Sequence, residues 1–139
     1  MVKKRIFGVD YGDARTGMAV SDLTGLIAGG VGVVRATGMR KTAAAVAESA
    51  KKHGAELIVV GYPVNMDGTE GARAEKARVF SEMLHDMTGI PVELFDERLT
   101  TVEAYEIMDA TGTRGKKRRD RVDTLAAEII LQDYLDSNK

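Results

Sequence analysis

Three acidic residues, Asp10, Glu97 and Asp123, have the type and the placement to do chemistry together. Asp10 ends an apolar run that a glycine turn follows, Glu97 ends a second apolar run, and Asp123 opens a helical segment just after a basic stretch. Chain breaks at the ends of central strands are where α/β folds place their chemistry. Clustered carboxylates repel one another unless a cation neutralises them. Because no cysteine or histidine lies nearby, the oxygen ligands predict a site for Mg²⁺ or Mn²⁺ in preference to zinc.

The basic stretch before Asp123 predicts an anion contact. Residues 114–121 hold six basic side chains and one acid, a local charge of +5, and because the whole chain carries −1 the remainder carries −6. One positive patch on an otherwise acidic surface indicates a directed contact with an anion. A solvated loop is the alternative interpretation of the same run.

The segment around Asp10 could also contact phosphate. Glycines at positions 8, 12 and 17 let the backbone turn tightly and let a phosphate approach main-chain N–H groups. Arg15 could add a bidentate contact to that phosphate. The alternative is a plain glycine hairpin with an aspartate in its turn.

Two more loops follow predicted strands. Residues 61–71 form a glycine-proline loop with Asn65 and an Asp-Gly turn, which could shape a substrate cleft or serve only as a connector. Residues 96–104 would let Glu97 reach a metal while Arg98 serves a phosphate or a salt bridge, and an ion pair followed by helix caps is the alternative.

Asp123 has a simpler explanation as well. We expect it in the first turn of a helix, where the helix dipole favours an acid in any case. The small pair Ala126-Ala127, however, would let this helix pack close against the sheet and bring Asp123 towards Asp10.

The apolar patterns predict an α/β fold with the order βββαβαβα and one further helix, in which an antiparallel hairpin leads into parallel crossover units. The predicted strands are 4–10, 16–20, 30–34, 57–60 and 91–96. The predicted helices are 40–53, 72–87, 100–109 and 120–135.

Length and composition limit the class of protein. We expect residues 1–139 to form a single domain. The chain has no cysteine, which excludes disulfides and thiolate sites. The apolar start is cut off at Asp10, so it is no signal peptide, and the longest uncharged stretch, 24–34, is too short to span a bilayer. We therefore expect a soluble, cytoplasmic chain with no membrane partner.

Together, the segments 8–22, 60–71, 96–104 and 122–132 resemble the YqgF family, also called the RuvX or pre-16S rRNA nuclease family, of the RNase H-like superfamily. The resemblance extends from Gly8 to Leu135, with the motifs in order. It implies a central five-stranded mixed sheet flanked by helices, with Asp10, Glu97 and Asp123 as the catalytic, metal-binding acids. Asp13 is an extra acid beside Asp10, so whether it assists Asp10 stays open.

This resemblance implies a hydrolase that cuts structured nucleic acid with one or two Mg²⁺ or Mn²⁺ ions. The basic run would grip flanking phosphates without sequence choice, and few aromatic residues argue against a single-strand binder that stacks bases. The predicted nucleic-acid contacts are Arg15, Tyr62, Asn65, Arg98, Lys116, Lys117, Arg118 and Arg119.

The family leaves two activities open: maturation of the 5′ end of precursor 16S rRNA, which we favour, and resolution of four-way (Holliday) DNA junctions. A resolvase should be a two-fold dimer, whereas the RNA activity needs only a monomer. A catalytically idle nucleic-acid-binding module is a further alternative. Actin-like kinases share a similar Asp-Tyr-Gly turn, but they need two such domains and 139 residues supply one.

Overall fold

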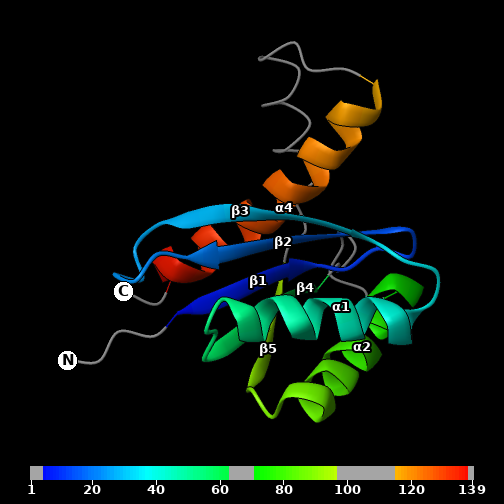
Figure 1. Ribbon diagram of the computed structural model, residues 1–139, viewed down its shortest axis with the longest axis horizontal. Coiled ribbons are helices and arrows are strands. Elements are labelled where there is room, and N and C mark those ends of the chain that lie inside the picture. Colours follow the sequence, from blue (N-terminus) through cyan, green and yellow to red (C-terminus); the bar gives the residue numbers. More distant parts are fainter. Residues whose placement is uncertain (1–4, 63–70, 97–114, 138–139) are drawn as a thin grey trace.

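The computed structural model describes residues 5–62, 71–96 and 115–137, and for residues 115–120 it describes the backbone alone. Its centre is a five-stranded sheet in the order β3-β2-β1-β4-β5 (Figure 1). The strands are β1 Ile6–Asp10, β2 Arg15–Ser21, β3 Ala28–Arg35, β4 Leu57–Tyr62 and β5 Val92–Asp96. The described helices are α1 Met39–Lys52, α2 Ala72–Thr88 and α4 Gly115–Ser137. The helix predicted over residues 100–109 lies outside the described residues.

The strand directions confirm the predicted mixed sheet. β1 and β2 form an antiparallel hairpin, and β3 continues it antiparallel to β2. β4 lies parallel to β1, and β5 lies parallel to β4. Because parallel strands end at the same edge of a sheet, Asp10, Tyr62 and Asp96 mark one common edge.

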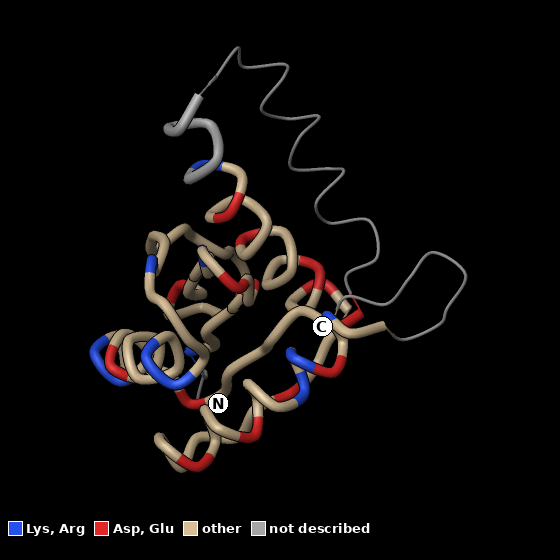
Figure 2. Tube along the Cα trace, turned by 90° about the vertical axis from the view of Figure 1, so that its right-hand side faces the viewer, with Lys and Arg blue, Asp and Glu red and all other residues tan. Residues whose placement is uncertain are grey.

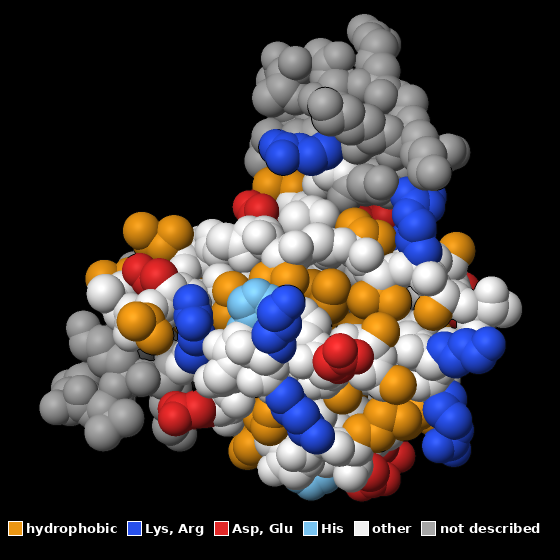
Figure 3. Space-filling model, viewed as in Figure 1, with side chains coloured by type: hydrophobic (Ala, Val, Ile, Leu, Met, Phe, Trp, Pro, Cys, Tyr) orange, Lys and Arg blue, Asp and Glu red, His pale blue; other side chains and the backbone are white. Residues whose placement is uncertain are grey.

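Helices α1 and α2 cover one face of the sheet with large apolar side chains. Phe7 and Val9 of β1 are fully buried on this face with residues of β4 and both helices. The other fully buried members of this cluster are Ala43, Val46, Ala50, Ile58, Val60, Phe80 and Leu84. The predicted helical face of α2 and the buried strand at β4 are thereby confirmed. Charged side chains of both signs lie among apolar ones on the outer surface shown in Figure 3.

On the opposite face of the sheet, α4 packs against glycines. Gly8 alternates with Phe7 and Val9 along β1, and a Cβ atom there would lie 2.8 Å from Leu131 Cβ. A side chain at Gly17 would overlap the backbone carbonyl oxygen of Asp123. Gly8 and Gly17 therefore face a helix, and the prediction that they let a phosphate approach the backbone was wrong.

The small residues of α4 complete this close contact. Ala126 is 1% exposed and Ala127 is fully buried, as expected for a helix that approaches the sheet closely. On β3, a side chain at Gly30 would overlap Thr124 and Glu128. At Gly8, Gly17 and Gly30, α4 therefore lies too close to the strands to leave room for a side chain.

α4 begins at Gly115, earlier than the predicted start at Asp120. The prediction treated the basic run as a separate stretch before the helix, with a solvated loop as one interpretation. Lysine and arginine are nevertheless good helix formers, and their long side chains can hold their charges apart. The run therefore forms the first turns of α4. No helix in the part of the chain that is described is long and apolar enough to cross a membrane.

Candidate active site

Asp10 stands where β1 gives way to a tight turn. The Thr16 hydroxyl, which is fully buried, donates a hydrogen bond to the Gly12 carbonyl at 3.2 Å and accepts one from the Gly12 N–H at 3.3 Å. A side chain at Gly12 would overlap the carbonyl oxygen of Arg15. This position needs glycine for the turn itself, and the turn fixes the chain just beyond Asp10.

The close seating of α4 brings Asp123 to the same place. Asp10 pairs with Gly17 in the β1–β2 register, and Gly17 in turn lies against the backbone of Asp123. Asp10 and Asp123 consequently line one hollow of about 220 Å³ at the edge where β1 ends. Its remaining walls are the turn after β1, with Arg15, and Arg73 of α2.

Arg15, the first residue of β2, links that strand to α4 through Asp123. Its Nε donates to Asp123 Oδ2 at 2.6 Å, and the two side chains are 31% and 19% exposed. The ion pair holds α4 to the start of β2. Asp123 lies well inside α4, not in its first turn, so the helix dipole does not account for this acid and that interpretation was wrong.

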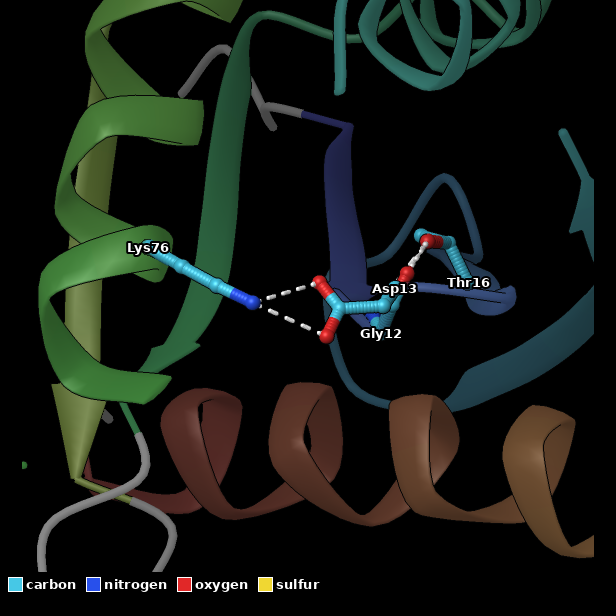
Figure 4. Close-up of polar contacts among 4 residues, drawn as sticks. All are labelled: Gly12, Asp13, Thr16 and Lys76. Atoms are coloured by element: carbon cyan, nitrogen blue, oxygen red, sulfur yellow. Dashed lines mark hydrogen bonds and ion pairs between the residues drawn. The ribbon is translucent and has the colours of Figure 1, made fainter. Parts of the chain in front are cut away.

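Asp13 points towards α2. Its carboxylate oxygens accept from Lys76 Nζ at 3.0 and 3.2 Å, and its side chain is 69% exposed (Figure 4). Figure 4 shows Lys76 reaching from α2, in front of β4, to this carboxylate in the turn after β1. Asp13 borders the hollow, but its charge is already balanced by a lysine.

Tyr11 anchors the turn to the apolar face of the sheet. Its ring stacks on Phe80 with 4.5 Å between centroids and 26° between planes. Burial raises the pKa of Tyr11, the charge of Asp13 raises it further, and Lys76 opposes the shift. Tyr11 is thus packed against the core, which limits how far the turn can move.

Some of the predicted nucleic-acid contacts lie in the described part of the chain, and others lie outside it. Tyr62 ends β4, and its hydroxyl accepts a hydrogen bond from Arg78, whose guanidinium also lies 5.5 Å from the ring centroid. Tyr62 is not among the residues that line the hollow. The residues at positions 116–119 lie in the first turns of α4. Asn65, Glu97 and Arg98 lie outside the described residues.

The charge along α4 changes sign near the hollow. The helix carries Lys116, Lys117, Arg118 and Arg119 at its start, whereas four acids and one arginine occupy residues 121–137. Figure 2 shows these acids along the described part of the helix. Glu128 is half-buried against Gly30; burial raises the pKa of its carboxyl group, and Arg121 and the Gly30 N–H oppose the shift.

The donors present fit a hard divalent cation. Within residues 5–62, 71–96 and 121–137 no three acids or histidines form a complete metal-binding group. Two carboxylates, Asp10 and Asp123, nevertheless share the hollow, and carboxylate oxygens are the ligands that Mg²⁺ and Mn²⁺ prefer. The third predicted ligand, Glu97, directly follows Asp96, which ends β5 at the same edge of the sheet.

Two cations at the hollow were not found from the sequence. Arg73 lines it, and Lys76 binds Asp13 beside it; both lie in the first turns of α2. The sequence feature that could have indicated them is a pair of basic residues at the start of a helix that follows a predicted strand and loop. Without the sheet order, nothing in the sequence shows that this helix begins beside β1.

Comparison with solved structures identifies the class of fold as RNase H-like. RuvC of Thermus thermophilus, solved with a Holliday junction substrate, aligns with a TM-score of 0.59 and 16% identity, covering 97% of this chain and 95% of that one. The fowlpox virus resolvase, solved with Holliday junction DNA, aligns with a TM-score of 0.57 and 11% identity over 96% of this chain and 98% of that one. At these identities the likeness establishes the fold alone.

The chain belongs to the RuvX family, whose model, described as a Holliday junction resolvase, matches residues 4–137. The "Putative pre-16S rRNA nuclease" of Syntrophus aciditrophicus is 44% identical over 133 residues, which is 96% of this chain and 89% of that protein. The protein of the same name from Myxococcus xanthus is 42% identical over 135 residues, covering 97% and 89%. The predicted family and fold are confirmed.

Proposed function

We propose that this chain is a divalent-metal-dependent endonuclease that processes the 5′ end of precursor 16S rRNA. The observation that carries the proposal is the shared hollow of Asp10 and Asp123 at the carboxyl edge of the sheet. Similarity to relatives named as pre-16S rRNA nucleases supports the choice of substrate.

In this proposal Asp10, Glu97 and Asp123 are the catalytic acids and would hold Mg²⁺ or Mn²⁺. When bound, the ion lowers the pKa of a coordinated water and stabilises charge on the attacking and leaving oxygens. Asp10 is fixed by β1 and by the turn that Thr16 closes. Asp123 is fixed by the seating of α4 and by its ion pair with Arg15. Rigid placement of this kind lowers the barrier because the reacting groups need not be ordered during the reaction.

The start of α4 would grip the substrate backbone. Lys116, Lys117, Arg118 and Arg119 lie at the positive end of the helix dipole, where basic residues are unfavourable. A bound polyanion would relieve this cost and would give affinity that depends on salt but not on sequence. Arg15, Tyr62, Asn65 and Arg98 are the other proposed contacts.

The test is cleavage of an end-labelled 16S precursor fragment and a labelled four-way DNA junction, side by side, with Mg²⁺ or Mn²⁺. We expect a defined cut at the 5′ side of the RNA, and its loss with EDTA. Asp10→Asn and Asp123→Asn should abolish cleavage while leaving RNA binding largely intact. Asp86→Asn, an exposed acid on α2, is the matched control and should cut normally. Activity that survives in both site variants would refute the assignment of the acids.

Resolution of four-way junctions is the second candidate, because the family model carries that description. It predicts a two-fold homodimer in solution and paired symmetric nicks in the junction. The RNA function predicts cleavage by a monomer or a homodimer. Binding of both substrates without any cleavage would instead favour an idle nucleic-acid-binding module.

A further inference from the structure

We propose that Arg73, in the first turn of α2, binds a backbone phosphate of the substrate on the side of the hollow opposite α4. The proposal rests on the proposed function, because it requires a nucleic-acid strand to cross the hollow. It makes Arg73 a substrate-positioning residue, in addition to the contacts predicted from the sequence.

The topology places Arg73 at the reactive edge of the sheet. α2 is the helix that follows β4 in the chain, and β4 is parallel to β1 and ends beside it. Arg73 therefore lines the same hollow as Asp10 and Asp123. The hollow is lined by the turn after β1, by α4 and by Arg73 at the start of α2, and α2 and α4 lie on opposite faces of the sheet.

The ion pairs around the hollow distinguish Arg73 from the other cations there. Arg15 is engaged by Asp123, and Lys76 is engaged by Asp13. Arg73 is exposed, and within the described parts of the chain it has no ion pair or side-chain hydrogen bond. A guanidinium with its donors uncommitted can bind a phosphate through two parallel hydrogen bonds, without first breaking a contact within the protein.

The rest of the first turn of α2 leaves Arg73 available. Glu75, the acid of this turn, forms its ion pair with Arg78, which lies three residues further along the helix. Gly71 at the N-cap brings no side chain, so the positive end of the 17-residue helix adds to the attraction for an anion.

Arg73 and the start of α4 would then hold the substrate strand from two sides. Because the contact is made to a phosphate that does not react, it should be equally strong in the ground state and in the transition state. Losing it should weaken binding and raise KM while kcat changes little.

The experiment measures RNA binding by fluorescence anisotropy in Mg²⁺, using the labelled 16S precursor fragment and an Asp10→Asn background that prevents cleavage. Arg73→Ala should raise Kd about tenfold, as expected for one charge-assisted hydrogen-bonded contact. It should also reduce the slope of log K against log salt by about 1. Arg73→Lys should restore the slope, since it keeps the charge, but only part of the affinity.

The matched control is Arg40→Ala. Arg40 is the second residue of α1, as Arg73 is the second residue of α2; both are exposed, and Arg40 is not among the residues that line the hollow. Its loss should change Kd less than twofold. Equal losses in the two variants, or an unchanged salt slope in Arg73→Ala, would overturn the proposal while leaving the nuclease assignment intact. Failure of the unmodified chain to bind either RNA or junction would overturn both.

Discussion

The two faces of the sheet meet their helices in different ways. On the face under α1 and α2, large side chains such as Phe7 and Leu84 interlock and are fully buried. On the face under α4, glycines at 8 and 17 let the helix backbone approach the strands directly. Both faces bury apolar side chains, Leu131 of α4 among them, but the second face also brings the backbone of a helix close to the strands.

The difference separates stability from positioning. Each large side chain removed from water stabilises the fold, wherever it lies in the core. Asp123 requires something else, because it must reach the hollow from a helix that is distant in sequence from Asp10. The glycines beneath α4 let that helix lie close enough to the sheet for Asp123 to reach the hollow.

The largest expected effect is on the apolar face. Leu84→Ala should lower the free energy of unfolding by about 2–5 kcal/mol, since it removes a fully buried side chain and leaves a cavity. Urea denaturation measures this, and Leu84→Met, which nearly conserves volume, should cost less than about 1.5 kcal/mol. At temperatures where Leu84→Ala is folded, its cleavage rate should be within about twofold of the parent. A much greater loss of rate would show that the two faces are not separable.

The second effect is on the α4 face. Gly17→Ala should lower the single-turnover cleavage rate about 100-fold, because the added methyl group displaces the Asp123 backbone and a shift near 1 Å can cost that much. Gly29→Ala is the matched control, since the nearest atom to its new methyl group, the Val20 carbonyl oxygen, is 4.0 Å away. If both variants cut at the same rate, the glycine seating has no role in placing Asp123.

The smallest effect is a difference in pH dependence. Tyr134 of α4 donates to Glu93, and burial, followed by that hydrogen bond and the charge of Glu93, raises its pKa to about 12. A raised pKa means that the folded chain keeps the proton while the unfolded chain loses it near pH 10, so stability falls as pH rises from about 10 to 12. Thermal denaturation of Tyr134→Phe should show a shallower fall over this range. A fall as steep as in the parent would show that Tyr134 does not cause this loss of stability at high pH.

Much of the fold could be predicted, because local patterns encode it. The run 57–60 predicted a buried strand, and the spacing of Ala77, Phe80 and Leu84 predicted the buried side of α2; both are confirmed. The predicted start of α4 was wrong because the basic run was not counted as helical, although lysine and arginine are good helix formers.

The site was harder to predict, because its contacts join distant segments. The spacing of charges suggested Asp10 and Asp123, and the structure brings both to one hollow. Gly8 and Gly17 were misread, since glycine in a turn and glycine under a helix look the same in a sequence. Arg73 and Lys76 could be placed only once the strand order was known, because α2 begins beside β1 through the pairing of β1 with β4. The roles of Asn65, Glu97 and Arg98 stay predictions.

The wide separation of Arg15 and Asp123 also sets when the hollow can form during protein synthesis. These two residues are 108 positions apart, and α4 is the last described element of the chain. Chains are made at about 5–20 residues per second, so roughly 5–20 s pass between the two. During that interval the glycine-lined face has no helix upon it and Asp10 has no neighbouring Asp123. If Asp10 and Asp123 are the catalytic acids proposed above, a nascent chain cannot cleave RNA before α4 has been made.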